Sequence, residues 1–325
     1  MTSRRELLKV ICLTALTAAR GAYAQTVTRS ARVGIIEYGA PPSGSFANGY
    51  LAALGRIGFG EPKTLSVERR FARGNAARYG ELLLDLVAAR VDLALAIGHD
   101  IAQVAKTTTP ALPLVAVGSE DPVMSGLIES YRSPGGNITG VTYLSPELAA
   151  KRLELLKEMV PALARVSVLW DPSHFDTYYR DMEPVARGVG IRLQLLEARE
   201  PAEIENAFAE ARRARADAMF IVPSRMINLQ AQRIGELALS ARLPTIAAYA
   251  SFAEAGGLMS YGAVAAEMLQ RAAAQSARIL GGAKAGTLPF ERAQTFELVV
   301  NRRTAKALDL EVPQTLLGRA DRIIE

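Results

Sequence analysis

The sequence has 325 residues, about twice the length typical of one domain, with 50% hydrophobic and 22% charged residues. This composition excludes a disordered, collagenous or low-complexity chain and predicts a globular protein with a substantial core. Beyond residue 25, charged side chains interrupt every apolar run before it reaches the roughly 20 residues that span a bilayer.

The first 24 residues have the layout of a secretory signal peptide. Three basic residues within 4–9 give a positive start, an uncharged and mostly apolar stretch covers 10–19, and Ala-Tyr-Ala at 22–24 supplies a small-residue cleavage site. A membrane anchor is the alternative, but the apolar stretch is too short to span. SRRELLK at 3–9 also resembles a twin-arginine signal, so we expect periplasmic export with the route left open.

Removal of residues 1–24 changes the charge and the cysteine content. The segment holds four basic residues and one acidic residue, so its loss lowers the net charge from +5 to +2. Such a small charge, without a basic stripe, predicts no nucleic-acid partner. The only cysteine, Cys12, also leaves, so the mature chain has neither a disulfide nor a thiol nucleophile.

Short β-prone stretches alternate with helical stretches along the mature chain. Several expected strands are nearly continuous in apolar residues, as in parallel sheets covered on both faces. The expected strands are 32–37, 91–97, 112–117, 165–170, 191–196, 218–222 and 245–249. The expected helices are 45–57, 75–89, 146–160, 201–214, 229–241 and 264–280. This alternation predicts an α/β fold built on parallel, doubly wound sheets.

The number of strands predicts two lobes. Roughly ten strands exceed one comfortable doubly wound sheet, and the glycine-rich segment PGGNITG at 134–140 makes a natural break. We therefore expect two doubly wound parallel-sheet lobes joined near residue 143. Ligands of such sheets bind beyond the carboxyl ends of the strands, so two facing lobes form a ligand cleft lined by strand-end loops.

Four stretches carry a family resemblance over essentially the whole mature chain. They are PGGNITGVTYLSPELAAKRLELLKEMVP at 134–161, EAGGLMSYG at 254–262, LPFERAQTFELVVNRRTAKALDLEVPQTLLGRADRIIE at 288–325, and the pairs Gly49-Tyr50 and Gly58-Phe59. These stretches resemble the ABC-transporter substrate-binding proteins of the tryptophan/tyrosine type. The sequence departs from the family pattern at Ser-Glu-Asp-Pro, 119–122, and at Gly-Ala-Pro-Pro-Ser-Gly-Ser, 39–45.

The resemblance implies a type I periplasmic binding-protein fold, with several crossings between lobes and a ligand closed in the cleft. It implies a first lobe of 32–143 plus 259–285 and a second lobe of 144–258 plus 286–325. It also implies two partners in the membrane, an ABC permease and its ATPase subunit. Both departing loops are expected to touch the ligand, so the best-known substrates of the family do not transfer directly.

Catalytic and cofactor patterns are missing from the sequence. The glycine-rich loop at 39–45 lacks the ending of a phosphate loop, and no serine lies in a GxSxG pattern. Two histidines and no mature cysteine make a zinc site unfavourable. We therefore expect no catalytic residues, no metal and no cofactor.

The candidate ligand-binding residues lie at the expected carboxyl ends of strands or in the loop at 39–45. They combine aromatic rings, hydroxyls and acids, which suit a small ligand with an apolar body and polar ends. They are Tyr38, Ser43, Ser45, Gly98, His99, Ser119, Asp121, Trp170, Ser224, Tyr249 and Tyr261.

Several of these candidates also have a purely structural interpretation. Ser43 and Ser45 either cap the following helix or both cap it and bind a ligand carboxylate, which Gly98 is also placed to do. Trp170 and Tyr249 end apolar strands and suit core packing equally well. Asp121 either stabilises a turn before Pro122 or faces a ligand ammonium group, and we favour the ligand role.

These observations predict an exported, monomeric solute-binding protein. It would capture a small organic anion or zwitterion, with an amino acid as the leading candidate, and deliver it to a membrane permease. A two-domain cleft enzyme is one alternative, which the predicted export and the lack of catalytic patterns disfavour. A ligand sensor that acts through a membrane receptor is the other, because it would use the same fold.

Overall fold

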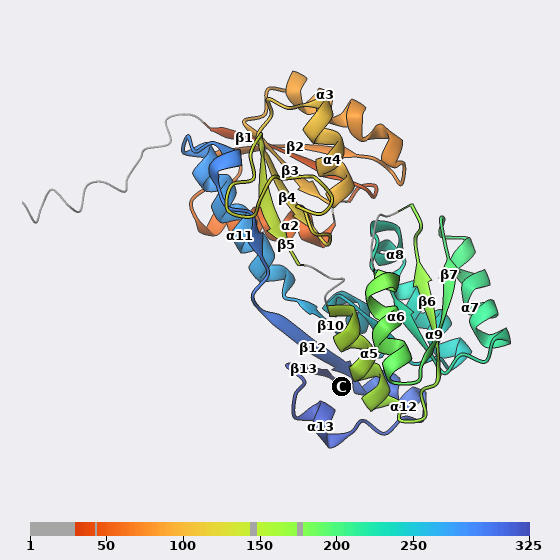
Figure 1. Cartoon of the computed structure of the whole chain (residues 1–325). Helices are drawn as coiled ribbons and strands as arrows, with labels where there is room; N and C mark the ends of the chain where they lie inside the picture. The colour runs from red at the N-terminus through yellow and green to blue at the C-terminus, as the bar shows by residue number, and fades with distance from the viewer. Residues whose placement is uncertain (1–29, 43, 144–147, 174–177) are drawn as a thin grey trace, which may run out of the picture.

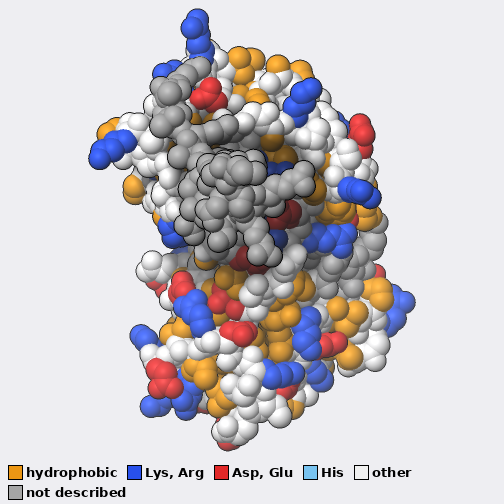
Figure 2. Space-filling view, turned by 90° about the vertical axis from the view of Figure 1, so that its left-hand side faces the viewer, with side chains coloured by type: hydrophobic (Ala, Val, Ile, Leu, Met, Phe, Trp, Pro, Cys, Tyr) orange, Lys and Arg blue, Asp and Glu red, His pale blue; other side chains and the backbone are white. Residues whose placement is uncertain are grey.

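The computed structural model describes residues 30–42, 44–143, 148–173 and 178–325, and only the backbone of 45 and 178–181. The predicted signal peptide lies outside these residues. Figure 1 shows two α/β lobes, each with helices around a central sheet, and α11 (Ala265–Leu280) beside the first lobe. None of the described helices is long and apolar enough to cross a membrane. Basic and acidic side chains are interspersed on the face shown in Figure 2.

The sheet of the first lobe has six strands in the order β11-β5-β4-β3-β1-β2, and all its pairings are parallel. Its strands are β1 (Ala31–Glu37), β2 (Leu65–Phe71), β3 (Leu93–Ile97), β4 (Leu114–Gly118), β5 (Ile138–Thr142) and β11 (Glu291–Arg292). Its flanking elements are α2 (Ser45–Arg56), η1 (Ala76–Arg78), α3 (Tyr79–Ala88), α4 (His99–Thr108) and η3 (Ala285–Thr287), together with α11.

The side chains of β3 point alternately to the two faces of the sheet, which explains why its sequence is a continuous apolar run. Leu93 and Leu95 pack into the core under α2 and α11, whereas Ala94 and Ala96 pack into the core under α3 and α4. Successive strand residues face opposite sides, so a sheet covered on both faces needs apolar residues at every position. The prediction of parallel, doubly wound sheets from such runs is confirmed.

The sheet of the second lobe has seven strands in the order β13-β12-β10-β9-β8-β6-β7, and only β10 and β12 pair antiparallel among them. The strands are β6 (Arg165–Trp170), β7 (Arg192–Glu197), β8 (Ala218–Ile221), β9 (Thr245–Ala247), β10 (Met259–Ala263), β12 (Phe296–Asn301) and β13 (Arg322–Ile324).

The helices of the second lobe form a layer on each face of its sheet. One core holds residues of α5 (Ala149–Met159), α6 (Tyr178–Gly188), α12 (Arg302–Ala307) and α13 (Gln314–Leu317). The other holds residues of α7 (Glu203–Arg213), α8 (Arg225–Leu229), α9 (Ala231–Ala241) and α10 (Ala250–Glu254).

The crossings between the lobes differ from the predicted boundaries. β10 was expected in the first lobe, but it pairs with β9 and β12 in the second sheet. β11 was expected in the second lobe, but it pairs with β5 in the first. The chain therefore returns to the first lobe only for α11, η3 and β11. There α11 packs so closely on α2 that a Cβ added at Gly49 would lie only 2.8 Å from the Leu269 Cδ1.

The predicted break at 134–140 is also only partly right. Ile138–Gly140 belong to β5, which pairs with β4 and β11 inside the first sheet. Only the turn before Ile138 is irregular. Gly140 serves close strand packing, since a Cβ there would lie 2.0 Å from the Ala116 carbonyl oxygen. A glycine-rich segment thus marked a strand start rather than a lobe boundary.

Candidate functional site

A cavity of about 310 Å³ lies between the lobes and is lined by residues of both. The first lobe contributes the segments after β1, β3, β4 and β5 and the start of α2, and the second contributes the loops after β8 and β9. These are carboxyl ends of parallel strands, where ligands of such sheets bind. The volume falls at the small end of the roughly 300–1,000 Å³ range of ligand pockets. The predicted cleft is therefore present, and its size suits a small solute.

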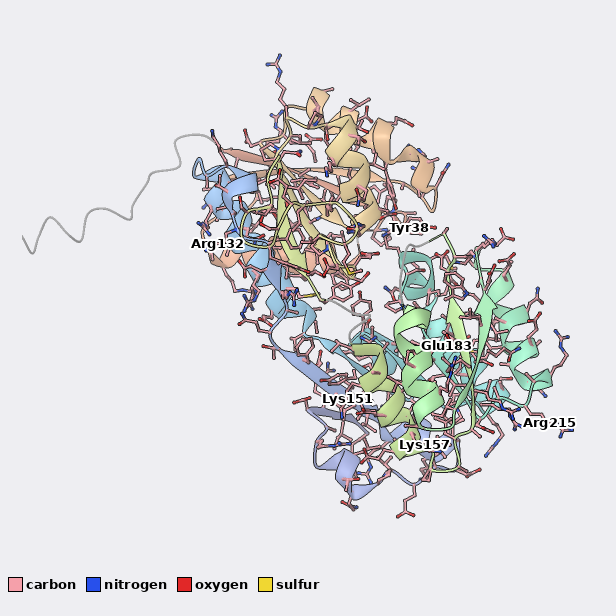
Figure 3. The ribbon with its side chains drawn as sticks, in the orientation of Figure 1. Tyr38, Arg132, Lys151, Lys157, Glu183 and Arg215 are labelled. Atoms are coloured by element: carbon pink, nitrogen blue, oxygen red, sulfur yellow. The ribbon has the colours of Figure 1, made fainter. Side chains whose placement is uncertain are left out.

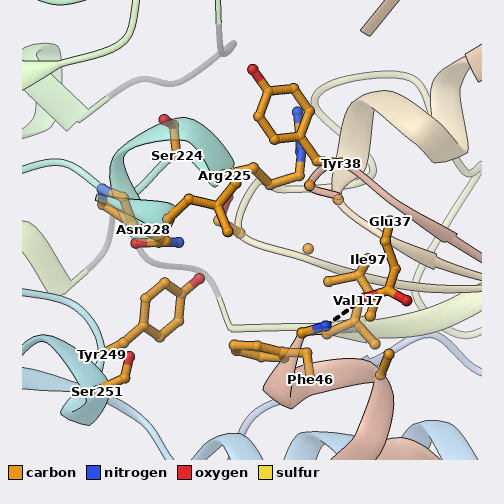
Figure 4. Close-up of a pocket in the computed structure, with 18 of the residues that line it drawn as sticks. Glu37, Tyr38, Phe46, Ile97, Val117, Ser224, Arg225, Asn228, Tyr249 and Ser251 are labelled. Atoms are coloured by element: carbon orange, nitrogen blue, oxygen red, sulfur yellow. Dashed lines mark hydrogen bonds between the residues drawn. The ribbon is translucent and has the colours of Figure 1, made fainter. Parts of the chain in front are cut away.

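Three aromatic rings contact one another in the apolar part of this cavity, which also includes Ile97 and Val117. The Tyr249 ring lies edge-on to Phe46, with centroids 5.9 Å apart, and edge-on to Tyr143, with centroids 5.3 Å apart. Phe46 and Tyr143 belong to the first lobe and Tyr249 to the second, and Figure 4 shows Phe46 and Tyr249 projecting into the pocket. In this arrangement, a flat apolar group of a ligand can pack against rings from both lobes.

One buried carboxylate, Glu37, lines the cavity at the end of β1. Its Oε2 accepts a hydrogen bond of 2.8 Å from the Gly44 backbone N–H at the start of α2, drawn as a dashed line in Figure 4. Its Oε1 has no hydrogen-bond partner among the described residues, although the Arg69 Nη1 lies 3.7 Å away. Glu37 is only 8% exposed. This oxygen is thus an acceptor still available to a ligand donor.

The negative charge of Glu37 changes the predicted role of the helix start. The sequence left open a ligand carboxylate near Ser43 and Ser45, but the Gly44 N–H at the start of α2 already binds the chain's own Glu37 carboxylate. A second anion there would be repelled at short range. Ser43 lies outside the described residues, and Ser45 begins α2 without a described side chain.

One cation, Arg225, reaches across the cleft from α8 in the second lobe. Its Nη2 forms a hydrogen-bonded ion pair with the Asp100 Oδ2 on α4 of the first lobe. The guanidinium carbon lies 5.3 Å from the centroid of the Tyr38 ring and 5.9 Å from that of Tyr79. Although burial acts against the charged form, Asp100 leads the effects that together raise the pKa of Arg225. Burial raises the pKa of Asp100, and Arg225 opposes that shift.

A buried imidazole, His99, lines the cavity, and a buried acid, Glu120, lies next to it outside the lining. His99 Nδ1 is 3.8 Å from the Glu120 Oε2, and His99 Nε2 is 3.0 Å from the Gln103 Nε2. Burial lowers the pKa of His99 to about 4 and raises the pKa of Glu120 to about 7. His99 is therefore neutral at neutral pH and is an uncharged part of the lining.

The structure brings six of the eleven candidate residues to the cavity. Tyr38 projects from the first lobe toward the second in Figure 3. Ser224 also caps α8, where its Oγ accepts from the Ile227 N–H at 3.1 Å. The six are Tyr38, Gly98, His99, Ser119, Ser224 and Tyr249.

Three candidates have other surroundings. Asp121 is absent from the cavity lining, and its Oδ1 accepts from the Val123 N–H at 2.8 Å and the Met124 N–H at 3.0 Å. Trp170 and Tyr261 pack against the core of the second lobe. The turn-forming role of Asp121 explains its Asp-Pro setting, so we no longer assign it to the ligand ammonium group.

Sequence reasoning missed both charged groups of the cavity. Glu37 is the last residue of β1 and was counted only as strand. Arg225 directly follows Ser224, which the strand-end rule had selected, so extending that rule by one residue would have found it. Phe46 and Tyr143 were also missed. The first lies one residue into α2, and the second directly follows the unrecognised strand β5.

The sequence comparisons agree with this two-lobed cleft. The family model for ABC transporter substrate binding proteins matches residues 39–324. The chain belongs to this family. A curated relative of this substrate-binding protein is the tyrosine-binding protein of Clostridioides difficile (strain R20291), which is 23% identical over 275 residues. That match covers 81% of this chain and 76% of the relative.

Solved structures confirm the type I periplasmic binding-protein fold of this substrate-binding protein. A conserved domain protein from Vibrio cholerae has a TM-score of 0.82 at 25% identity, and the match covers 91% of this chain and 100% of that chain. The L-Trp complex of an ABC domain from Streptococcus pneumonia has a TM-score of 0.82 at 21% identity, with the same coverage. The matched family and the curated relative are substrate-binding proteins rather than enzymes. A small-molecule ligand and a transporter partner follow for this chain.

Proposed function

We propose that this substrate-binding protein captures an amino acid with an aromatic or other flat apolar side chain and presents it to an ABC permease and its ATPase subunit. The main support is the cavity itself, in which three aromatic rings from both lobes lie beside one available carboxylate oxygen and one guanidinium. A zwitterion with a flat side chain matches that set. The relatives that bind tyrosine and L-Trp favour the same class.

The charges suggest an orientation for the amino acid. Its ammonium group would face the Oε1 of Glu37, and its carboxylate would face Arg225, on the side of the cavity next to Gly98. Glu37 is buried and Arg225 is partly buried, so each contact would form largely away from bulk water, where charge-assisted hydrogen bonds are strong. The side chain would then pack among Phe46, Tyr143 and Tyr249.

The remaining parts of the proposal concern the protein as a whole. It acts as a monomer in the periplasm, reached by way of the signal peptide in residues 1–24. It has no catalytic activity, a part of the proposal supported by the described lining of the cavity, which offers no activated nucleophile. Among the described residues, no group of three or more His, Cys, Asp or Glu side chains is placed to hold a metal ion.

A thermal-shift screen of the purified protein against the twenty amino acids, tyramine and 3-(4-hydroxyphenyl)propionate tests this function. At a ligand concentration of about 100 times Kd, binding adds about 2.7 kcal/mol to the free energy of unfolding and raises the Tm by several degrees. We expect the largest shifts with L-tyrosine, L-tryptophan and L-phenylalanine. Shifts only with amino acids whose side chains are not flat and apolar, or with no member of the panel, would contradict the proposal. Recovery of chemically unchanged ligand after incubation would support the absence of turnover.

A further inference from the structure

Arg225 and Asp100 form an ion pair that joins the two lobes inside the cleft. Arg225 lies on α8 of the second lobe and Asp100 on α4 of the first, and their side chains are 19% and 38% exposed. The pair therefore has to break or rearrange if the lobes move apart. An ion pair between a guanidinium and a carboxylate also has the chemistry with which a protein binds a carboxylate ligand.

The first lobe has a built seat for the Arg225 guanidinium. Gly98 has a φ of 135°, and a Cβ on it would lie 2.3 Å from the Arg225 Nη1. The ring centroids of Tyr38 and Tyr79 lie 5.3 Å and 5.9 Å from the guanidinium carbon, within reach of a cation–π contact. The backbone and both rings thus hold the cation at one point of the cleft.

Arg225 lies between two cavities and has one hydrogen-bond donor, its Nε–H, without a partner among the described residues. It lines the aromatic cavity and also a second, polar cavity of about 310 Å³, whose lining includes Asp100, Asp171 and Arg199. This Nε–H is also buried. A buried, unpartnered guanidinium donor is costly, and a ligand acceptor arriving from the aromatic cavity would satisfy it.

The position of Asp100 next to this cation is unfavourable for its own negative charge. Burial raises the pKa of the Asp100 carboxyl group, which means that its surroundings disfavour the charge and that Arg225 compensates for it. If a ligand carboxylate took its place on Arg225, the desolvated cation would keep an anionic partner throughout. Asp100 could then turn toward the polar cavity, which it also lines.

We propose that Asp100 occupies, in the unliganded cleft, the place of the ligand's carboxylate on Arg225, so that binding exchanges one carboxylate for the other. This inference rests on the proposed function and adds a selection rule to it. Ligands with a carboxylate can displace Asp100, whereas ligands that lack one cannot. Asp100 is then a competitor of the ligand, and its charge weakens binding.

The competition predicts that Asp100→Asn tightens binding of carboxylate ligands. The apparent Kd equals the intrinsic Kd divided by the fraction of molecules in which Arg225 is free to bind the ligand. If Asp100 leaves Arg225 free in about one-tenth of the molecules, removing this competitor lowers the apparent Kd about tenfold. The substitution keeps an acceptor for the Ile101 N–H, which bonds to the Asp100 Oδ1 at 2.9 Å. Asp309→Asn is the matched control, because Asp309 pairs with Arg242 on the exposed surface of the second lobe.

Isothermal titration calorimetry with three probes tests the exchange. L-tyrosine carries both charged groups, 3-(4-hydroxyphenyl)propionate lacks the ammonium group, and tyramine lacks the carboxylate. For Asp100→Asn we expect Kd to fall about tenfold for the first two probes and to stay unchanged for tyramine. For Arg225→Gln we expect the affinity for the first two probes to be lost, and for Asp309→Asn we expect parental values throughout.

The outcomes separate this inference from the proposed function. If the parent binds L-tyrosine and Asp100→Asn binds it equally or more weakly, the exchange is wrong while the proposed function stands. Weaker binding of tyramine by Asp100→Asn would instead make Asp100 an ammonium partner, which also overturns the exchange. If neither the parent nor any variant binds any of the probes, both the proposed function and the exchange are overturned. Unliganded Tm values of all variants show whether each one is folded.

Discussion

The rings of Phe46 and Tyr249 meet edge to face across the cleft, with centroids 5.9 Å apart and planes inclined by 76°. Phe46 lies on α2 of the first lobe, and Tyr249 precedes α10 of the second. The contact therefore links the two lobes within the cavity itself. A ligand that packs on both rings gains its apolar contacts only when the lobes are closed, which couples binding to closure.

Replacement of Tyr249 should weaken binding without unfolding the protein. Aromatic pairs contribute about 0.5–1.5 kcal/mol beyond the burial of their area, so Tyr249→Leu should raise the Kd for L-tyrosine at least about 2- to 13-fold. Tyr131→Leu is the matched control, since Tyr131 pairs edge-on with Phe290 at 6.4 Å and does not line the cavity. Calorimetry that gives equal losses for both variants would place the ligand elsewhere.

Ligand binding should bring the lobes together. The chain has no cysteine after Cys12, so Ala88→Cys on α3 and Ala209→Cys on α7 would place one spin label on each lobe. Both positions are exposed. A ligand that contacts both lobes favours the closed state by its difference in affinity for the two states. Electron–electron double resonance should therefore show a narrower distance distribution, shifted to a shorter mean, on addition of L-tyrosine. An unchanged distribution at saturation would refute closure.

Glu37→Gln should selectively weaken ligands that carry an ammonium group. Loss of one partner of a buried charge-assisted pair costs about 2–5 kcal/mol, so Kd for L-tyrosine should rise by at least about 30-fold. Binding of 3-(4-hydroxyphenyl)propionate should not weaken, because it has no ammonium group to lose a partner. Glu68→Gln, on β2 and outside the cavity lining, is the control. Equal losses for both probes would mean that Glu37 acts only through its bond to the Gly44 N–H.

Glu120→Gln should change how stability depends on pH. Burial raises the pKa of Glu120 to about 7, above its ordinary 4.5, so the folded protein holds this proton over a pH range where the unfolded chain releases it. The parent therefore loses stability relative to Glu120→Gln as pH rises from 4.5 through 7. At 1.36 kcal/mol per pKa unit, the relative loss over this range is about 3 kcal/mol. Burial lowers the pKa of His99, but both proteins retain it, and its effect largely cancels.

Urea denaturation at pH 5, 6, 7 and 8 measures this difference. The unfolding free energy of Glu120→Gln minus that of the parent should rise between pH 5 and pH 7 and level off toward pH 8. Glu311→Gln, at an exposed position, should run parallel to the parent over the whole range. A constant difference between parent and Glu120→Gln would show that the buried carboxyl group titrates normally.

The sequence predicted β1, β6 and the edge strand β7 to within one residue, but it missed the edge strand β2 and the buried strands β5 and β10. β6 was predicted at its observed bounds, and β1 within one residue, because both are apolar runs paired on both sides. β2 was missed. Its sequence, LSVERRF, carries three charged residues, which an edge strand paired only with β1 tolerates. A local sequence pattern indicates a strand mainly through its buried apolar residues, so a strand with few buried residues, such as β2, is hard to predict.

The cavity could be predicted only in part, for a related reason. Gly98, Ser119 and Ser224 were found because the carboxyl ends of parallel strands mark the ligand side of a sheet. The rule does not say which of several polar residues turns inward. It therefore placed Asp121 in the site, although its carboxylate closes a local turn, and passed over Arg225, whose partner lies 125 residues away in the other lobe. Pairings of that kind depend on tertiary structure.

Gly98→Ala should damage the seat of Arg225 from the opposite lobe. The φ of 135° at Gly98 is one that residues with a Cβ rarely adopt, and the added Cβ would lie 2.3 Å from the Arg225 Nη1. Backbone strain of this kind costs about 1–3 kcal/mol, so the Tm of the unliganded protein should fall by a few degrees. The displaced guanidinium should also bind carboxylates poorly, which should raise Kd for L-tyrosine and for 3-(4-hydroxyphenyl)propionate but not for tyramine.

Gly126→Ala is the control, because Gly126 has a φ of 68° with nothing within 4 Å of an added Cβ. Its Tm should fall to a similar or smaller extent while all three affinities stay parental. Parental affinities in Gly98→Ala as well would mean that the close approach of Arg225 to Gly98 has no part in ligand recognition.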